Sequence, residues 1–403
     1  MSTSLLYHAW GVRGYVYQHC DFVNGGIIFY LNQEKDFRCA RCGCRRVIRR
    51  GTVTRHFKSL PVGGKPVTLV LPVQRVACSN CAALGQVEVA FAEARRSYTK
   101  SFERYAVDLC RMATIDDVAR RLGVSWDTIK DIEKRYLQQR FGKPKLQHLR
   151  LIDIDEFYLG KTGRFITLVL DLESGAIVFV GEGKGGEALD PFWKRLRASG
   201  AKIQAVAMDM SAAYTAAVAD HLPNAAVIFD HFHVIKLFNE KLTDLRREMF
   251  REATDKLHKD VLKGTRWLLL KQPEHLDRKK DESKRLHEAL TLNEPLAKAY
   301  YLREDLCQFW TQPSKEKAAQ FLEDWISRAS ASGVRMLMQF AKTLASRRRG
   351  LLAYYDFGIT TGKLEGTNRK IRTLQNRAYG YRDRAFFKLK LYALHQVKYA
   401  LVG

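Results

Sequence analysis

The amino-acid sequence predicts a multidomain α+β protein, because the type of predicted element changes several times along the chain. Strand-like segments fill residues 1–95, helical segments fill 96–145, and strands alternate with helices over 146–234 before a purely helical stretch begins. A chain of 403 residues is too long for one hydrophobic core, and 46% apolar residues are enough to build several. The sequence therefore predicts two or three domains.

The charge of the chain points to a polyanionic partner. Lys and Arg number 68 against 43 Asp and Glu, which gives a net charge of +25. Such an excess suits phosphate binding with release of counterions, although a ribosomal or membrane-surface partner would suit the same charge. No signal peptide is visible, and the apolar stretch 201–235 is interrupted by Asp209, Asp220 and Asp230, so we expect a cytoplasmic protein without a membrane partner.

Four of the eight cysteines have the spacing of two zinc knuckles, Cys39-x2-Cys42 and Cys78-x2-Cys81. A gap of two residues lets both thiolates of a knuckle face one ion, and the strands between the knuckles bring the pairs together. A closed four-thiolate site stabilises a fold and leaves no open position for catalysis. We therefore predict a structural zinc ribbon, with Cys44 as an alternative ligand to Cys42.

Residues 115–130, IDDVARRLGVSWDTIK, have the pattern of a helix-turn-helix. Ala119 permits close helix contact, Gly123 opens the turn, and Ser125 caps the second helix. Beside a zinc module in a basic chain, this pair is interpreted as DNA-binding, with an ordinary helical pair as the alternative. The side chains expected to meet bases or phosphates are Trp126, Thr128, Lys130 and Arg135.

Three strand patterns, LRLIDIDEFYLG, RFITLVLDL and AIVFVGEG, follow the helix-turn-helix and precede alternating helices and strands. This order predicts an α/β domain with a mixed sheet. The glycine-rich segment GEGKGGEA lacks both the P-loop ending and the dinucleotide fingerprint, so nucleotide use is unsupported. After residue 234 the strand pattern stops, and residues 235–350 are predicted to be entirely helical.

Acidic residues are concentrated at the strand ends of this predicted sheet. Asp153, Asp155 and Glu156 lie on the first strand, and Asp209 ends the fourth strand, which can be its neighbour. Strand alternation puts 153 and 155 on one face, so spacing does not choose between these two aspartates. Glu365, on a helix rich in Lys and Arg, is the candidate third carboxylate. Three such acids would hold two magnesium ions for phosphodiester transfer; solvated acids at strand ends are the alternative.

The order of these motifs resembles the ISL3 family of bacterial insertion-sequence transposases over essentially the whole chain. The most specific blocks are IDIDEFYLGKTGRFITLVLDLESG, AVAMDMSAAYTAAVADHLPNAAVIFDHFHVIK and TTGKLEGTNRKIRTLQNRAYGYRD. The resemblance implies an RNase H-like catalytic core with an Asp-Asp-Glu triad on Asp155, Asp209 and Glu365. It also implies that a helical insertion interrupts this core after its fifth strand. Asp153 stands where relatives often carry a neutral residue.

Asp230-x2-His233 resembles the Cys/Asp-x2-His signature of transposase superfamilies with insertions. Asp230 would support Asp209, and His233 would contact a scissile phosphate; a helix-starting Asp and a packed His are the alternative. His231-Phe232-His233 is also a His-hydrophobic-His triplet, which single-strand nickases use to bind a metal. Those triplets lie within a central strand, whereas this one follows a strand into a helix, so the nickase is the weaker interpretation.

The C-terminal segment interleaves cations with aromatic rings, a pattern suited to phosphate contacts and base stacking near a cut end. A solvated basic helix is the alternative, and a tyrosine recombinase is disfavoured because no matched Arg and His constellation precedes the two tyrosines. The DNA-binding candidates are Arg369, Lys370, Arg372, Arg377, Tyr379, Tyr381 and Arg382.

The sequence thus predicts a DDE transposase that binds terminal inverted repeats and catalyses end cleavage and strand transfer with Mg²⁺ or Mn²⁺. We expect a homodimer on double-stranded DNA, in the bacterial cytoplasm and associated with the nucleoid. A non-catalytic, transposase-derived DNA-binding regulator is the alternative. The predicted domains are 1–95 (zinc ribbon), 96–145 (helix-turn-helix), 146–234 (first part of the catalytic core), 235–350 (helical insertion) and 351–403 (second part of the core, with a basic tail).

Overall fold

The structure is a computed structural model that describes residues 5–33, 36–160, 164–229, 231–265, 267–271, 273–359 and 362–395. The chain divides into two compact units. The first comprises Met1–Lys143, Asn376–Lys390 and Val397–Gly403, and the second comprises Pro144–Gln375 and Leu391–Gln396. Among the described helices, none combines the length and apolarity that crossing a bilayer requires.

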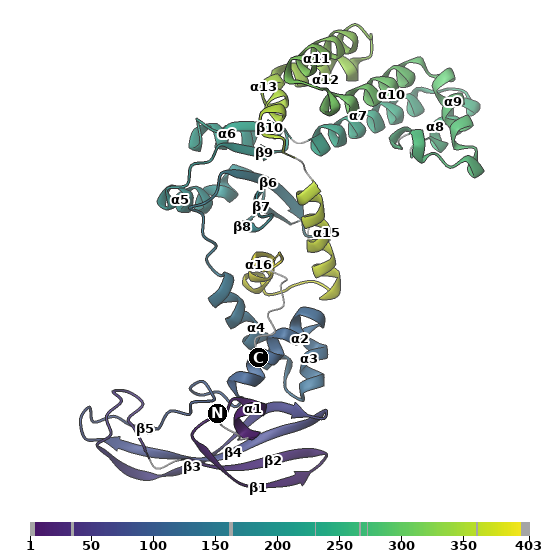
Figure 1. The fold of residues 1–403 in the computed structure, drawn as a ribbon. Helices are drawn as coiled ribbons and strands as arrows, with labels where there is room; N and C mark the ends of the chain where they lie inside the picture. The colour runs from purple at the N-terminus through teal and green to yellow at the C-terminus, as the bar shows by residue number, and fades with distance from the viewer. Residues whose placement is uncertain are drawn as a thin grey trace. The chain divides into compact units, whose positions relative to one another are not determined.

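The first unit begins with a short helix and a five-stranded sheet (Figure 1). Its strands follow the order β1-β2-β4-β3, with β5 paired to β4, and β2 runs parallel to β4 between two antiparallel hairpins. The strand-rich N-terminal domain predicted from the sequence is therefore present, although its first helix was not predicted. The elements are α1 (Leu5–Trp10), β1 (Tyr15–Val23), β2 (Gly26–Gln33), β3 (Val47–Val62), β4 (Lys65–Cys78) and β5 (Leu84–Gln86).

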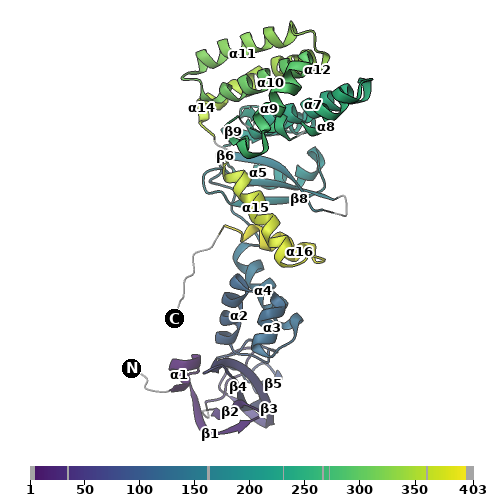
Figure 2. The same cartoon turned by 90° about the vertical axis from the view of Figure 1, so that its right-hand side faces the viewer.

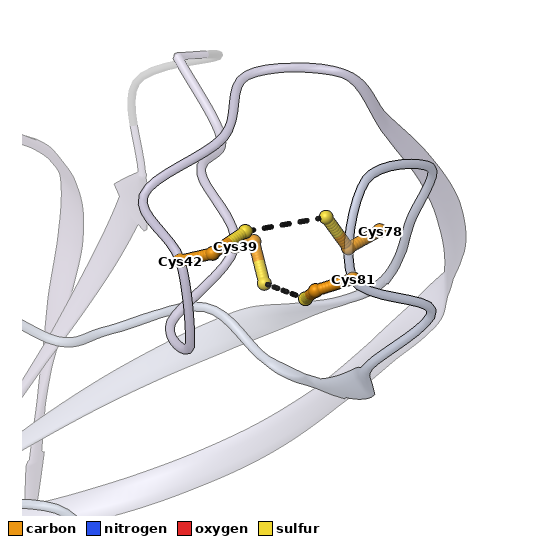
Figure 3. A group of neighbouring side chains, drawn as sticks. All are labelled: Cys39, Cys42, Cys78 and Cys81. Carbon is orange, nitrogen blue, oxygen red and sulfur yellow. Dashed lines mark hydrogen bonds between the residues drawn. The ribbon is translucent and has the colours of Figure 1, made fainter.

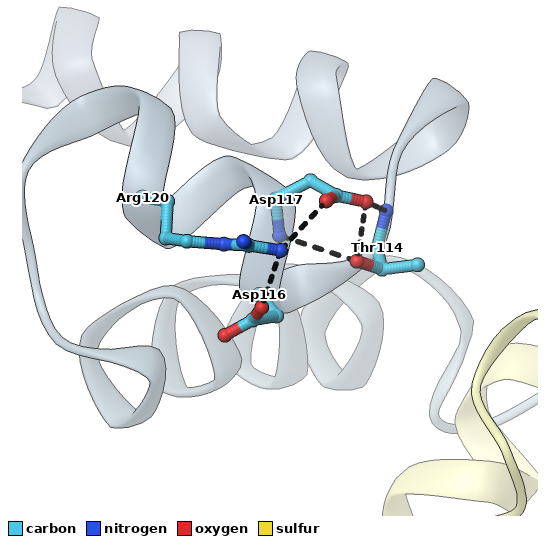
Figure 4. A network of polar contacts seen from close by, with 4 residues as sticks. All are labelled: Thr114, Asp116, Asp117 and Arg120. Atoms are coloured by element: carbon cyan, nitrogen blue, oxygen red, sulfur yellow. Dashed lines mark hydrogen bonds and ion pairs between the residues drawn. The ribbon is translucent and has the colours of Figure 1, made fainter.

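Three helices follow the sheet and form the predicted helix-turn-helix: α2 (Lys100–Met112), α3 (Ile115–Leu122) and α4 (Trp126–Phe141). Figure 4 shows how α3 begins, with the hydroxyl of Thr114 accepting from the backbone N–H of Asp117 while Asp117 accepts from the N–H of Thr114. Gly123 ends α3 with φ 63°, a left-handed conformation that glycine adopts without a Cβ clash. The hydroxyl of Ser125 caps α4, as predicted.

The C-terminal helix packs on the helix-turn-helix within the first unit. Helix α16 (Arg384–Tyr392) begins after Asp383, whose carboxylate accepts from the N–H of Phe386 at 2.9 Å. The same carboxylate lies 3.1 Å from Lys130 and 2.8 Å from Lys134 of α4. Lys390 also pairs with the buried Glu133. The sequence assigned 351–403 to the second part of the catalytic core with a basic tail. In the structure, residues 376–390 belong to the same compact unit as the helix-turn-helix, and these ion pairs join the segment to α4.

The second unit is built on a mixed sheet of five strands in the order β10-β9-β6-β7-β8. Strands β6, β7 and β8 pair antiparallel, whereas β9 runs parallel to β6 and β10 runs parallel to β9. This confirms the mixed sheet predicted from the order of elements. The elements are β6 (Leu151–Tyr158), β7 (Phe165–Asp171), β8 (Ile177–Glu182), η1 (Gly186–Leu189), α5 (Asp190–Ser199), β9 (Ala205–Met208), α6 (Ala212–His221) and β10 (Ala226–Phe229).

The two faces of this sheet have different roles. Ile152 and Ile154 of β6 join the core formed with α5 and α6, in which Phe192 and Trp193 are buried. Because side chains alternate along a strand, Asp155 lies on the opposite face. Helix α15 (Gly362–Arg377) lies on that face, where it contacts Asp155 (Figure 1).

A helical insertion joins β10 to α15, as predicted, and it forms a layer of its own beyond the sheet (Figures 1 and 2). Trp325 and Trp310 are buried in its core, and the indole of Trp325 donates to the carbonyl of Leu302 at 2.8 Å; Trp267 is 65% exposed. The elements are α7 (His231–Glu252), α8 (Lys256–Gly264), η2 (Leu268–Leu270), η3 (Pro273–His275), η4 (Arg278–Lys280), α9 (Glu282–Leu292), α10 (Glu294–Cys307), η5 (Gln308–Thr311), α11 (Lys315–Ser330), α12 (Arg335–Ser346), α13 (Arg348–Leu352) and α14 (Tyr354–Phe357).

The insertion returns to the sheet through a close helix-strand contact. Gly350 of α13 faces β10 so closely that an added Cβ would lie 2.5 Å from the ring of Phe229. The absence of a side chain at this position therefore permits the packing of α13 against the edge strand. The guanidinium of Arg347, one turn earlier, lies over the same ring, 5.4 Å from its centroid.

Candidate active site and zinc site

The four predicted zinc ligands converge in the first unit (Figure 3). The antiparallel pairing of β3 with β4 aligns Val47 with Cys78, so the turn before β3 and the turn after β4 lie together. The sulfurs of Cys39 and Cys81 are 3.7 Å apart, and those of Cys42 and Cys78 are 3.6 Å apart. Tetrahedral zinc with bonds of about 2.3 Å requires sulfurs separated by about 3.8 Å. The cluster therefore has the geometry of a closed four-thiolate site.

Backbone amides favour the thiolate form of the first cysteine in each knuckle. The pKa of Cys78 is lowered to about 6 by the backbone N–H groups of Cys81 and Asn80. The pKa of Cys39 is lowered in the same way, by the N–H groups of Cys42 and Arg41. Because zinc binds the thiolate, these turns prepare the sulfurs for the metal.

The position of Cys44 settles the alternative left open by the sequence. Its sulfur accepts from the backbone N–H of Arg46 at 3.3 Å, and its carbonyl accepts from the N–H of Cys39 at 2.9 Å. Cys42, not Cys44, contributes to the four-sulfur cluster. Cys44 instead helps to close the turn of the first knuckle.

The two predicted catalytic aspartates lie on neighbouring strands of the second unit. Strands β6 and β9 pair in parallel with Ile154 opposite Met208, so Asp155 and Asp209 are the next residues on adjacent strands. Neighbouring strands are about 4.8 Å apart, so Asp155 on the central strand β6 lies close to Asp209 at the end of β9. Asp155 is 6% exposed, and its Oδ1 accepts from the N–H of Glu156 at 2.8 Å. Asp153, on the same face, is also buried.

The loop that follows Asp209 is fixed on both sides. The Oδ1 of Asp209 accepts from the backbone N–H of Ser211 at 2.9 Å, which orients the carboxylate at the start of α6. Arg347, from the end of the insertion, lies 3.4 Å from the carbonyl of Met210 and 3.4 Å from the hydroxyl of Thr215. The insertion thus supports the segment that carries the second aspartate, a contact that the sequence did not predict.

Glu365, the predicted third carboxylate, lies in the first turn of α15. Its side chain is 52% exposed and pairs with Arg369 at 2.5 Å. Three residues further along the helix, Nδ2 of Asn368 donates to Oδ2 of Asp155 at 2.8 Å. Positions three apart share one face of a helix and are separated by about 4.5 Å along its axis. The start of α15 is therefore held next to Asp155.

The three carboxylates are not gathered in the way that the cysteines are. Among the residues that the structure describes, the four cysteines form the group whose ligand atoms lie within 4.8 Å of one another, and the triad of Asp155, Asp209 and Glu365 does not form such a group. The assignment of these acids as catalytic thus remains a prediction, supported by strand register and by the contact between α15 and β6.

His233 lies beside the first aspartate. Its Nε2 is 3.7 Å from Oδ1 of Asp155, at the start of α7. His231 points elsewhere and stacks on Trp310, with ring centroids 4.2 Å apart. The two histidines lie on a helix with different neighbours, so they are not placed to share a metal as in a nickase. Asp230, predicted to support Asp209, lies outside the described residues.

Tyr214 is a residue of the site region that the sequence did not single out. Its buried hydroxyl donates to Glu156 at 2.7 Å, accepts from the N–H of Gly185 at 3.0 Å and lies 3.1 Å from the hydroxyl of Thr167. Burial raises the pKa of Tyr214, so the hydroxyl remains protonated and able to donate. These hydrogen bonds connect α6 to β6, to β7 and to the glycine-rich loop that contains Gly185.

The DNA-binding candidates of the helix-turn-helix differ in how they are placed. Trp126 is 45% exposed at the start of α4, and Lys130 lies 5.2 Å from its ring centroid while pairing with Asp383. Thr128 is half-buried, and its hydroxyl lies 2.8 Å from that of Ser125. Arg135 faces inward instead, where it pairs with Glu103 at 2.7 Å and donates to the hydroxyl of Tyr98. The prediction that Arg135 faces DNA is therefore not supported by its position.

The candidates of the C-terminal segment also divide into exposed and engaged residues. Tyr379 is 100% exposed with φ 51°, and Arg382 is exposed. Tyr381 packs on Phe387 with ring centroids 4.8 Å apart, which leaves its ring less available for stacking on a base. The remaining cations make internal contacts: Arg369 with Glu365, Lys370 with His395, Arg372 over Phe157, and Arg377 with the carbonyl of Met112.

Three family models match this chain. Residues 152–391 match a transposase model of the ISL3 family, 87–137 match the helix-turn-helix domain of transposase family ISL3, and 35–81 match the zinc-finger of transposase IS204/IS1001/IS1096/IS1165. The chain belongs to the ISL3 family of transposases. This confirms the family, the zinc ribbon and the helix-turn-helix predicted from the sequence, and the first match spans all three predicted catalytic acids of the transposase.

Individual proteins are also similar to this chain. The ISL3 transposase is 31% identical over 371 residues to the transposase for insertion sequence element IS1001 of Bordetella parapertussis, covering 91% of this chain and 90% of that protein. It is 28% identical over 373 residues to the transposase for IS1557 of Mycobacterium tuberculosis, covering 86% and 83%. A chain of the Drosophila P element transposase strand transfer complex aligns with TM-score 0.38 and 10% identity, covering 75% of this chain and 93% of that chain.

Proposed function

We propose that this ISL3 transposase binds the terminal inverted repeats of its insertion sequence, cleaves the DNA at those ends and joins them to target DNA. The observation that carries this proposal is the position of Asp155 on β6 and of Asp209 directly after the adjacent parallel strand β9, with the start of α15 held against Asp155 by Asn368. Glu365 lies one helical turn before that contact. This arrangement fits an RNase H-like core with an Asp-Asp-Glu triad.

The side chains of the triad fit a hard divalent cation. Carboxylate oxygens are the ligands that Mg²⁺ and Mn²⁺ prefer, and Asp155, Asp209 and Glu365 would hold them. When bound, two such ions supply an activated water or hydroxyl and stabilise the leaving oxygen. Glu365 would exchange its ion pair with Arg369 for the cation, and the backbone amides of Glu156 and Ser211 would keep the two aspartates oriented.

His233 and the helix-turn-helix would bind DNA at different places. His233, beside Asp155, would donate to an oxygen of the scissile phosphate. On the first unit, the exposed side chains of Trp126, Tyr379 and Arg382 and the half-buried Thr128 would meet the inverted repeat, with α4 in the major groove. We propose that two subunits bind together, because two ends have to be joined to one target, and that the protein works on chromosomal DNA in the bacterial cytoplasm.

A labelled duplex that carries one inverted repeat of the element tests the proposal. The transposase should cut this duplex at the repeat end in Mg²⁺ or Mn²⁺, and Asp209→Asn should reduce cleavage by about 10³-fold or more, the scale for loss of one essential catalytic group. Binding to the duplex should change less than about threefold. Asp220→Asn, a matched change at an exposed acid of α6, should cleave like the wild type.

Two results would contradict the proposal. Cleavage retained by Asp209→Asn would remove Asp209 from the catalytic site. Specific binding of the duplex without cleavage in either metal would instead identify the chain as a transposase-derived DNA-binding regulator.

A further inference from the structure

Asn368 is the side chain through which α15 reaches the first catalytic aspartate. Its Nδ2 donates to Oδ2 of Asp155 at 2.8 Å. The orientation of this amide is fixed by chemistry, because a carboxylate only accepts and so must face the nitrogen of the amide. The amide oxygen, Oδ1, consequently points away from Oδ2 of Asp155.

The oxygen of the same amide is buried and finds no hydrogen-bond donor among the residues that the structure describes. Buried amide oxygens nearly always have a partner in folded proteins, so this oxygen has room for an ordered water or an ion. The surroundings indicate what kind of ligand. Asp155 lies on β6, Asp209 directly follows the neighbouring strand β9, and Glu365 lies one turn earlier on the helix of Asn368.

A divalent cation matches this oxygen better than a further hydrogen-bond donor does. Amide oxygens of Asn, like carboxylate oxygens, are ligands of hard cations such as Mg²⁺ and Mn²⁺. A neutral oxygen also completes the coordination without adding to the repulsion among the clustered acids. One amide would then have two functions, with its nitrogen orienting Asp155 and its oxygen binding the ion.

We propose that Asn368 is a further ligand of the divalent-cation site, through Oδ1. This inference rests on the proposed function, because it requires the cation site of Asp155, Asp209 and Glu365. It adds a fourth residue to that site and explains why the contact between α15 and β6 is made by an amide rather than by a second charged group.

Mn²⁺ binding to the full-length, zinc-loaded protein on the end duplex tests the inference. Free Mn²⁺ is counted by electron paramagnetic resonance, with the duplex alone as the blank. Asn368→Ala should weaken Mn²⁺ binding by about 10-fold, the scale for loss of a group next to a bound metal. Asn368→Asp keeps an oxygen and loses the N–H donor, so it should bind Mn²⁺ within about threefold of the wild type or more tightly.

Asn376→Asp is the matched control, because it makes the same change at an exposed position of α15 and should leave Mn²⁺ binding unaltered. Equal affinity for the duplex and an equal melting temperature show that each variant is folded. Wild-type Mn²⁺ binding by Asn368→Ala overturns the inference. Binding by Asn368→Asp as weak as that of Asn368→Ala also overturns it, since the N–H donor alone would then matter.

Asp209→Asn separates failure of this inference from failure of the proposed function. If Asp209→Asn binds Mn²⁺ like the wild type, the cation site itself is absent and the proposed function fails with it. If Asp209→Asn loses Mn²⁺ binding while Asn368→Ala keeps it, the site exists and the assignment of Asn368 alone is wrong.

Discussion

The zinc ribbon and the carboxylate site are constructed in opposite ways. The four cysteines come from two short turns at one end of a β-hairpin, and their sulfurs already lie 3.6–3.7 Å apart in pairs. The three acids come from two strands and a helix, and Glu365 is held by Arg369 rather than by the other two. A site that only stabilises a fold can be closed, whereas the proposed catalytic site would have to admit a phosphate and release it, for which a movable ligand is an advantage.

The two sites also differ in how far away in the sequence the residues lie that hold their side chains in place. Each knuckle is shaped by backbone N–H groups within three residues of the sulfur that they contact. The carboxylate site depends on contacts that are distant in sequence, such as Asn368 with Asp155 and Arg347 with the loop after Asp209. Changes at the zinc site should therefore lower stability, whereas changes at Asp155, Asp209 or Glu365 should lower activity.

The largest effect is expected from two substitutions, one at each site, which should separate the role in stability from the role in activity. Cys78→Ser should abolish zinc binding and unfold the ribbon, because a structural zinc contributes folding energy directly. Asp209→Asn should leave the zinc content and the melting temperature unchanged, since it removes a charge from a half-buried carboxylate of the proposed cation site. Mass spectrometry measures the zinc content of each variant, and limited proteolysis measures whether the N-terminal domain is folded. A Cys78→Ser protein that keeps one zinc and resists protease would contradict the comparison.

Gly350→Ala should have the next largest effect, and only in the second unit. The new methyl group would meet the ring of Phe229 and push α13 away from β10, which should destabilise the unit by about 1–3 kcal/mol. The displacement should also slow cleavage, because Arg347 precedes this helix and supports the loop after Asp209. Zinc content should not change. The melting temperature and the cleavage rate test this prediction. Wild-type values for both would show that α13 accommodates the methyl group without loss of stability or activity.

Thr114→Ala should destabilise the helix-turn-helix by about 1 kcal/mol, the usual loss for an N-cap residue. The hydroxyl of Thr114 caps α3, and Asp117 completes the reciprocal bond (Figure 4). Unfolding in urea measures the loss. Thr114→Ser keeps the cap and should be close to the wild type, so equal losses in both variants would argue against the capping role.

Asp383→Asn should have the smallest effect, about 0.2–1 kcal/mol, because partly exposed ion pairs contribute little. Asn still caps α16, so the change isolates the charge that pairs with Lys130 and Lys134. The bond from Lys134 and the N–H of Phe386 lower the pKa of Asp383 below its usual range. The stabilisation is therefore present above the unfolded pKa of about 3.9 and is lost as the pH falls below it. The stability difference between wild type and variant should shrink in acid; a constant difference would contradict the ion pairs.

The sequence predicted the elements whose signals are local. The two CxxC spacings identified the zinc site, and the order of strands placed Asp155 beside Asp209, because parallel neighbours end at the same edge of a sheet. Asn368 lay within a motif block but was not recognised, since only the contact with Asp155 reveals its role. The best available signal was its position three residues after Glu365, on the same helical face.

The errors concern contacts that the sequence does not encode locally. Arg135 was assigned to DNA because it lies on the second helix of the motif, yet its partners Glu103 and Tyr98 lie about 30 residues earlier. Residues 376–390 were assigned with the catalytic core and its basic tail, because their partners on α4 are some 250 residues away in the sequence.

The docking of residues 376–390 on α4 has a consequence for incomplete chains. A product that stops before residue 376, through a premature stop codon or proteolytic trimming, would retain every cysteine and helices α1 to α4 of the first unit. It would still lack Asp383 and Lys390, which hold Lys130, Lys134 and Glu133 in place. Such fragments should bind the terminal inverted repeats weakly. They would therefore compete poorly with the intact transposase for these DNA ends.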